Sequence, residues 1–138
     1  MEVGEKGSLT MTLTQEQVVQ FADFCGDDHP MHLDLEYAAK TRFGRPVAQG
    51  VFTLALISAV LGTKIGGPDV TVVQLGQSAR FLRAVYPGDT LTATCEVTRI
   101  NPERRIAILD CKCVNQEGEP VLTGETTIML DRMPYGAS

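Results

Sequence analysis

Residues 50–61 read GVFTLALISAVL, and only Thr53 and Ser58 interrupt their apolar side chains. The stretch is hydrophobic on every side, which is typical of a helix buried inside a domain. A helix that spans a bilayer needs roughly 20 such residues, so this one is too short. We therefore expect a buried helix that begins at Gly50 and is stopped by Gly62 and the glycines and proline that follow it.

The half of the chain that follows this helix has the two-residue repeat of β-strands. Within residues 90–98, polar side chains alternate with Leu91, Ala93, Cys95 and Val97, as in a strand with one buried face. Less regular alternation predicts three more strands, over residues 70–82, 105–114 and 120–130. Turn-forming sequences at 87–89 and 115–118 separate the last three strands, which should form an antiparallel meander.

Shorter helices are expected before the buried one. Residues 14–17 fit a capping box, and the apolar residues after them share one helical stripe that Gly26 is placed to end. A second short helix is expected over residues 34–40. Pro30 lacks an amide donor, so residues 27–32 should form a turn or loop in which polar side chains converge.

These elements predict one α+β domain over residues 1–138. A buried helix followed by about four antiparallel strands suggests a curved sheet wrapped around that helix, which is hot-dog topology. The length suits a single domain with its own core, and the sequence contains no repeat, low-complexity tract or evident linker.

Composition narrows the class of function. A hydrophobic fraction of 43% with 21% charged residues is that of a globular protein, and a net charge of -5 argues against a nucleic-acid binder. The four cysteines lack CxxC spacing and the N-terminus lacks a secretory leader. We therefore expect reduced thiols in a cytoplasmic protein that neither spans a membrane nor binds nucleic acid.

Both histidines of the chain lie within residues 26–34, which read GDDHPMHLD. One interpretation is a polar turn whose Asp28 and Asp34 cap neighbouring helices. A second is a zinc site made by His29, His32 and an aspartate, although the spacing matches no established zinc pattern and the cysteines lie far away. The third is general acid/base chemistry, since carboxylate and imidazole groups exchange protons when they converge.

The third interpretation is favoured by a family resemblance. Residues 26–34 resemble the GDxNPxHxD signature of MaoC-like (R)-specific enoyl-CoA hydratases, with Asp27, Pro30, His32 and Asp34 in register. Residues 38–51 resemble the family's AxxTxFGxxIAHGM segment, 56–62 its LISxxLG helix and 81–90 its FxxPVxxGDT turn. Four segments in order cover nearly the whole chain. Two positions depart from the pattern, because His29 replaces the usual asparagine and Gln49 the histidine of the AHGM segment.

The resemblance implies hydration of a 2-enoyl thioester, or the reverse dehydration, in fatty-acid or hydroxyalkanoate metabolism. Asp27 and His32 would be the catalytic pair, and the Gly50 amide would donate to the thioester oxygen. Ser58, His29 and Gln49 are expected to contact the substrate region. Without the resemblance, Gly50 equally well only turns the chain into the helix, and the Ser58 hydroxyl more simply bonds its own helix.

No metal or separate cofactor is expected, since coenzyme A would be part of the substrate. The partner would be an acyl thioester of coenzyme A or of acyl-carrier protein. The candidates for contact with its phosphates are the basic residues nearest the motifs, Arg42, Arg45, Lys64, Arg80 and Arg83. The same fold also supports a thioesterase, or a non-catalytic acyl-thioester-binding module. An apolar face and sheet edge left by one helix predict a homodimer.

Overall fold

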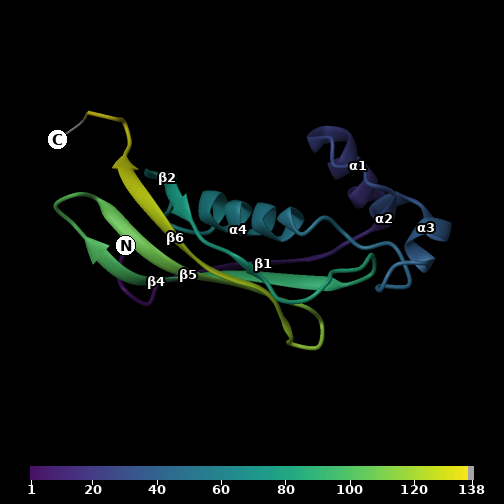
Figure 1. The fold of residues 1–138 in the computed structure, drawn as a ribbon. Helices are drawn as coiled ribbons and strands as arrows, with labels where there is room; N and C mark the ends of the chain where they lie inside the picture. Colours follow the sequence, from purple (N-terminus) through teal and green to yellow (C-terminus); the bar gives the residue numbers. More distant parts are fainter. Residues whose placement is uncertain (137–138) are drawn as a thin grey trace.

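The computed structural model describes residues 1–136 and contains one antiparallel sheet with four helices (Figure 1). The strands are β1 (Lys6–Thr12), β2 (Val70–Gln77), β3 (Arg80–Phe81), β4 (Thr90–Asn101), β5 (Ile106–Val114) and β6 (Pro120–Arg132). The helices are α1 (Gln15–Cys25), α2 (Pro30–Leu33), α3 (Leu35–Ala39) and α4 (Val51–Thr63). The strand order is β1-β4-β5-β6-β2, and the short β3 pairs with β6.

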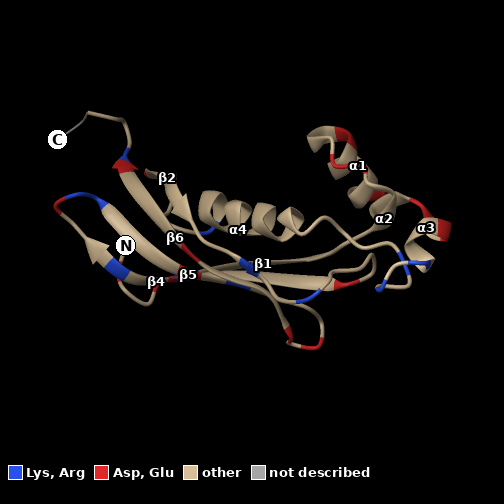
Figure 2. Cartoon of the chain, in the orientation of Figure 1, with Lys and Arg blue, Asp and Glu red and all other residues tan. Residues whose placement is uncertain are grey.

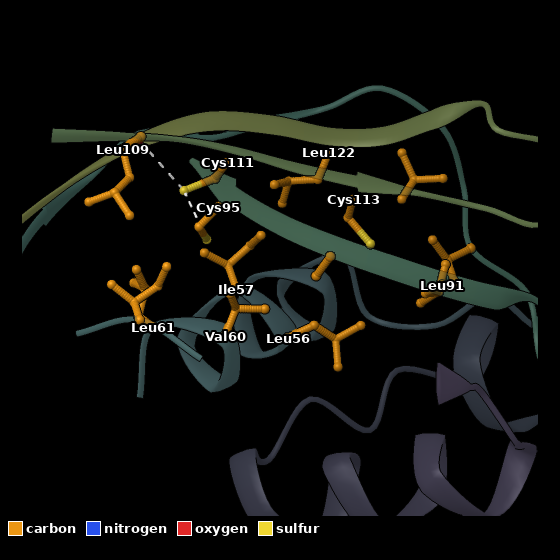
Figure 3. Packing of buried hydrophobic residues seen from close by; sticks show 14 of the residues in the cluster. Leu56, Ile57, Val60, Leu61, Leu91, Cys95, Leu109, Cys111, Cys113 and Leu122 are labelled. Carbon is orange, nitrogen blue, oxygen red and sulfur yellow. Dashed lines mark hydrogen bonds between the residues drawn. The ribbon is translucent and has the colours of Figure 1, made fainter. Parts of the chain in front are cut away.

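Helix α4 lies along one face of the curved sheet, as the sequence predicts. Its Leu56, Ile57, Val60 and Leu61 point toward the sheet (Figure 3) and belong to the buried core. The inward residues of β4 alternate along the strand as expected, and β4, β5 and β6 form the predicted meander. The core therefore sits between one helix and the concave side of one sheet.

The helices before α4 form a separate group at one end of the sheet (Figure 1). Thr14 and Gln17 make the predicted capping box of α1, and Gly26 ends this helix with a φ of 88°. Residues 30–33, expected to be a turn or loop, form the short helix α2, because Pro30 occupies its first turn, where no amide donor is needed. The predicted helix over 34–40 is present as α3.

Strand β1 is the main element that the sequence analysis missed. Lys6–Thr12 reads as a polar lead because it is an edge strand with few buried side chains. It pairs with β4 over its whole length, and two pairs of threonines bond across the strands. The extended conformation of β1 is therefore stabilised by long-range pairing with β4 rather than by its own sequence pattern.

The predicted strand over 70–82 is divided into β2 and β3. The backbone of Ser78 lies directly against Gly124 of β6, where no side chain would fit, and the pairing register shifts between Gln74 and Gly76. The expected stop of α4 at Gly62 was also wrong. The helix continues to Thr63, and the chain turns at Gly66 and Gly67, which both have positive φ.

Helix α4 is less completely covered than its composition suggests. Val51, Ala55, Ser58 and Gly62 follow a helical repeat and are all exposed in the single chain. The edge strand β2 also exposes apolar side chains, including Val73 and Leu75. Within residues 1–136, no helix is long and apolar enough to cross a membrane.

Candidate active site

His32 is a buried residue whose ring is fixed by one hydrogen bond. It lies on α2 with 2% of its surface exposed, and its Nδ1 is 2.6 Å from the carbonyl oxygen of Val47. A carbonyl only accepts hydrogen bonds, so Nδ1 carries a proton and donates it. Nε2 is therefore the nitrogen that is free to exchange protons with a substrate.

Asp27 faces this free nitrogen from the loop that follows α1. Its Oδ2 is 3.6 Å from His32 Nε2, a separation too long for a direct hydrogen bond. The Asp27 side chain is half exposed, whereas that of His32 is buried. His32 Nε2 and Asp27 Oδ2 thus face the same space, where one water molecule or hydroxyl group can contact both.

A cleft of about 500 Å³ contains both groups. Gly50 lines it together with them, and Gly50 is the N-cap of α4. The first amides of a helix have no carbonyl partner within it, and they lie at the positive end of the helix dipole. A Cβ on Gly50 would come within 3.3 Å of the Phe81 ring, so a larger residue would crowd this wall.

Basic residues lie at the same cleft. Arg42 and Arg83 are among its lining residues, and the loop after α3 contains basic residues, whose positions are coloured blue in Figure 2. The Arg83 guanidinium is 3.3 Å from Glu119. A hydrogen bond from Asn115, followed by the charge of Arg83, lowers the pKa of Glu119, which keeps this carboxylate ionised. The cleft is thus lined by two guanidinium groups, of which that of Arg83 is paired with a carboxylate.

Arg45 and Lys64 differ in their relation to this cleft. The Arg45 guanidinium lies 3.9 Å from the centre of the Tyr86 ring, in a neighbouring hollow that shares Phe43 and Arg83 with the cleft. Lys64 is the C-cap of α4 and therefore lies at the opposite end of the helix from Gly50. Of the five candidate basic residues, Arg42 and Arg83 are the two at the cleft itself.

Three residues expected to contact the substrate do not line the cleft. His29 is exposed, and its Nδ1 accepts a hydrogen bond from Met31 N, which makes it the N-cap of α2. Ser58 lies on the exposed face of α4. Gln49 is buried and turned toward α1, where it bonds to main-chain carbonyls.

The structure also adds residues that the sequence analysis did not select. Met31, Phe43, Thr53, Phe81, Leu82 and Val121 line the cleft. Phe43 and Phe81 stand inside the recognised motifs, which is the signal that pointed toward them. The others are brought there by long-range contacts, such as the bonds from Val47 N to Met31 O and from Ala48 N to Val85 O.

Two further groups bear on the chemistry. Within the described part of the chain, no cluster of three or more His, Cys, Asp or Glu side chains is arranged to hold a metal ion. Cys95 and Cys111 face each other across β4 and β5, with their sulfur atoms 3.7 Å apart as free thiols (Figure 3). Neither thiol lines the cleft that holds Asp27 and His32.

A curved antiparallel sheet with one helix along its concave face defines the hot-dog fold, and solved structures confirm it. An unliganded R-hydratase from Pseudomonas aeruginosa superposes with a TM-score of 0.87 at 38% identity, covering 94% of this chain and 81% of that one. An (R)-hydratase from Aeromonas caviae gives a TM-score of 0.88 at 36% identity, over 94% of this chain and 96% of that one.

Sequence comparisons agree with the resemblance. Residues 2–111 match the family described as "MaoC like domain". A 3-hydroxybutyryl-CoA dehydratase from Methylorubrum extorquens is 39% identical over 132 residues, which cover 96% of this chain and 82% of that protein. The (R)-specific enoyl-CoA hydratase of Aeromonas caviae is 36% identical over 94% of this chain and 96% of that protein. The chain belongs to the MaoC-like dehydratase family.

Proposed function

We propose that this protein is a hydro-lyase that adds water to the double bond of a 2-enoyl thioester and forms the (R)-3-hydroxyacyl product, or catalyses the reverse reaction. The observation that carries the proposal is the placement of Asp27 and His32 Nε2, 3.6 Å apart, in a cleft that also holds the start of α4. Relatives named as enoyl-CoA hydratases and a 3-hydroxybutyryl-CoA dehydratase, 35–39% identical to this chain, support it.

Hydration requires a nucleophilic water at carbon 3 and a proton for carbon 2. One member of the Asp27 and His32 pair accepts a proton from the water as its oxygen bonds to carbon 3. The electrons of the double bond move toward the thioester oxygen. The pair then returns a proton to carbon 2, so that it regains its starting protonation state and no cofactor is consumed.

The enolate-like oxygen formed between these steps needs a hydrogen-bond donor. The Gly50 amide is our candidate, because it opens α4 and borders the cleft. A donor of this type contributes roughly 3 to 4 kcal/mol to transition-state stabilisation in other enzymes. The absence of a side chain lets a thioester approach beside Phe81.

The carrier end of the substrate would leave the cleft past Arg42 and Arg83, both of which line it. Coenzyme A and acyl-carrier protein both attach the acyl group through a phosphorylated pantetheine arm, so these guanidinium groups suit either carrier. Both carriers therefore remain within the proposed substrate class.

A homodimer is part of the proposal. A second copy would cover the exposed face of α4 and the exposed apolar side chains of β2. Mutual pairing of this kind is typical of two-fold symmetric dimers. We also infer a cytoplasmic location, which the unbonded pair of facing thiols Cys95 and Cys111 supports.

The first experiment measures the loss of enoyl-thioester absorbance with crotonyl-CoA, together with chiral analysis of the product. Hydration to the (R)-3-hydroxyacyl thioester that collapses in Asp27→Asn and His32→Ala is the expected result. Absence of hydration across short, medium and long enoyl chains would refute the proposal.

Separate assays of thiol release and of ligand binding test the two alternatives. Release of free thiol without hydration would indicate a thioesterase. Only the shared fold supports this class, because a Thermus thermophilus thioesterase superfamily member matches with a TM-score of 0.64 at 11% identity. Ligand binding without turnover would indicate a non-catalytic acyl-thioester-binding module.

A further inference from the structure

Gln49 is a buried polar residue that the proposed reaction does not use. It stands between Ala48 and Gly50, which both line the cleft, yet Gln49 itself does not. Its side chain is 2% exposed and points in the opposite direction, toward α1 and the loop that carries Asp27. A direct contact with substrate is therefore not its function in this structure.

The carboxamide of Gln49 bridges two main-chain carbonyls. Its Nε2 donates to Asp27 O at 3.1 Å and to Val18 O of α1 at 3.4 Å. Because both partners are acceptors, the NH₂ group must face them, and the orientation of the amide is fixed. The oxygen Oε1 is then left buried, and among residues 1–136 it has no hydrogen-bond partner.

That arrangement is not the one that stability alone would favour. A buried acceptor without a donor opposes folding, whereas an apolar side chain of the same shape would avoid this cost. The compensating benefit must come from the two hydrogen bonds that the NH₂ group donates. One of its two acceptors belongs to Asp27, whose own side chain is half exposed and whose amide makes only a weak 3.4 Å bond to the sulfur of Cys25.

Residues 47–50 thus connect three functional groups. Val47 O fixes the His32 ring, the Gln49 side chain fixes the main chain of Asp27, and Gly50 opens α4. We propose that Gln49 is a positioning residue that sets the Asp27 carboxylate against His32 Nε2. Its kinetic consequence rests on the proposed hydratase function, whereas the geometric claim does not.

The kinetic test uses Gln49→Met, which keeps the shape of the side chain but cannot donate, and Gln49→His, whose ring N–H can restore one bond. A small misplacement of a reacting group costs on the order of 100-fold in rate. We expect kcat of Gln49→Met to fall by about this factor with KM little changed, and Gln49→His to recover part of it. In an Asp27→Asn background, Gln49→Met should cause little further loss, because the group that it positions is gone.

A matched control is Gln116→Met, which removes another glutamine with two hydrogen bonds, to Asp89 and Thr90. We expect this variant to retain wild-type kcat. A raised KM with unchanged kcat in Gln49→Met, or an additive loss in the Asp27→Asn background, would overturn the positioning proposal.

A second readout does not depend on turnover. The chain has two histidines, so [¹⁵N]histidine labelling gives two pairs of ring-nitrogen signals, and His29→Asn shows which pair belongs to His32. At fixed pH, the Nε2 shift of His32 in Gln49→Met should move toward its value in Asp27→Asn, and Gln116→Met should leave it in place. An Nε2 shift that stays at the wild-type value in Gln49→Met overturns the proposal. If the wild type hydrates no thioester, the proposed function fails, and this comparison still decides the role of Gln49.

Discussion

Gly50 combines two properties at one residue, a free amide at the start of α4 and the absence of a side chain beside Phe81. Its φ of -57° is ordinary for any residue, so backbone conformation does not require glycine here. The requirement is space, since an added Cβ would lie 3.3 Å from the Phe81 ring. Substitution should therefore act on the cleft rather than on the helix.

We expect Gly50→Ala to reduce kcat by roughly 100-fold, because the added methyl group would hold the thioester away from the backbone amide, which alanine retains. The thermal unfolding midpoint should change little, and steady-state hydration of crotonyl-CoA measures the effect. Gly50→Ala combined with Phe81→Leu is the control, because it relieves the crowding. Full recovery in this double variant would assign the loss to crowding against Phe81, whereas a loss that persists would assign it to the methyl group at residue 50 itself.

The four cysteines differ sharply in their surroundings. Cys25 is exposed, whereas burial raises the pKa of Cys113 to about 11, and the hydrogen bond with Cys111, followed by burial, raises the pKa of Cys95. We expect one thiol per native chain to react with an aromatic disulfide reagent at pH 8, and four after denaturation. Cys25→Ser should abolish the native reaction. Two or more fast thiols in the native protein would contradict this burial pattern.

At the residue scale, the sequence predicts contacts between residues that are close in the chain and misses contacts between residues that only the fold brings together. The convergence of Asp27 and His32 could be predicted because both lie in one short segment with a recognisable spacing. The position of Gln49 could not, because its bonds reach Val18 and Asp27, which are 31 and 22 residues away in the chain. A long separation in sequence also hides Val121 as a cleft residue.

Among the elements, α2 is the one that carries His32 into the cleft. It has four residues, too few to be stable alone, and its N-cap is His29, whose Nδ1 accepts from Met31 N at 3.1 Å. The His29 ring also packs edge-on against Tyr37 of α3, with centroids 5.5 Å apart. His29 thus supports α2 at the position where the family pattern has asparagine.

We predict that His29→Asn retains activity close to wild type, because asparagine is a strong N-cap residue. His29→Ala removes the acceptor and should lower the free energy of unfolding by about 1 kcal/mol, the usual cost of losing a cap. It should also reduce kcat, since His32 sits on the same short helix. Urea unfolding and hydration kinetics of both variants test this. Equal behaviour of His29→Asn and His29→Ala would contradict the capping role.

At the same scale, the fold was predictable where a pattern belongs to one element. The apolar run of α4 and the alternation of β4 each indicate their structure directly, and the capping box marks the start of α1. Strand β1 was not predictable, because its order depends on pairing with β4. The interruption between β2 and β3 was equally hidden, since it arises where Ser78 meets Gly124 of another strand.

For the whole molecule, the buried thiols link stability to pH. Cys113 is fully buried, and its pKa rises from 9.0 to about 11. Above pH 9 the unfolded chain releases this proton while the folded chain retains it, so the free energy of unfolding should fall as the pH rises toward 11. Urea midpoints at pH 8 and pH 10.5 measure this fall, which should be smaller in Cys113→Val. An identical fall in both proteins would assign the effect to other groups.

The surface of the single chain leads to the last prediction. Val51 of α4 is 57% exposed and Leu75 of β2 is 53% exposed, although both side chains are apolar. If a second copy covers them, the protein in solution should have twice its chain mass of 15.0 kDa, about 30 kDa. Light scattering after gel filtration measures this mass directly.

Two substitutions should shift that mass toward the monomer. Ala55→Glu places a charge on the exposed face of α4, and Leu75→Asp places one on β2, so each would bury an unpaired charge in the dimer. Leu35→Asp is the matched control, because Leu35 is 74% exposed at the start of α3, away from both surfaces. A wild-type protein that remains monomeric at micromolar concentration would refute the dimer. A stable dimer unaffected by both substitutions would place its interface elsewhere.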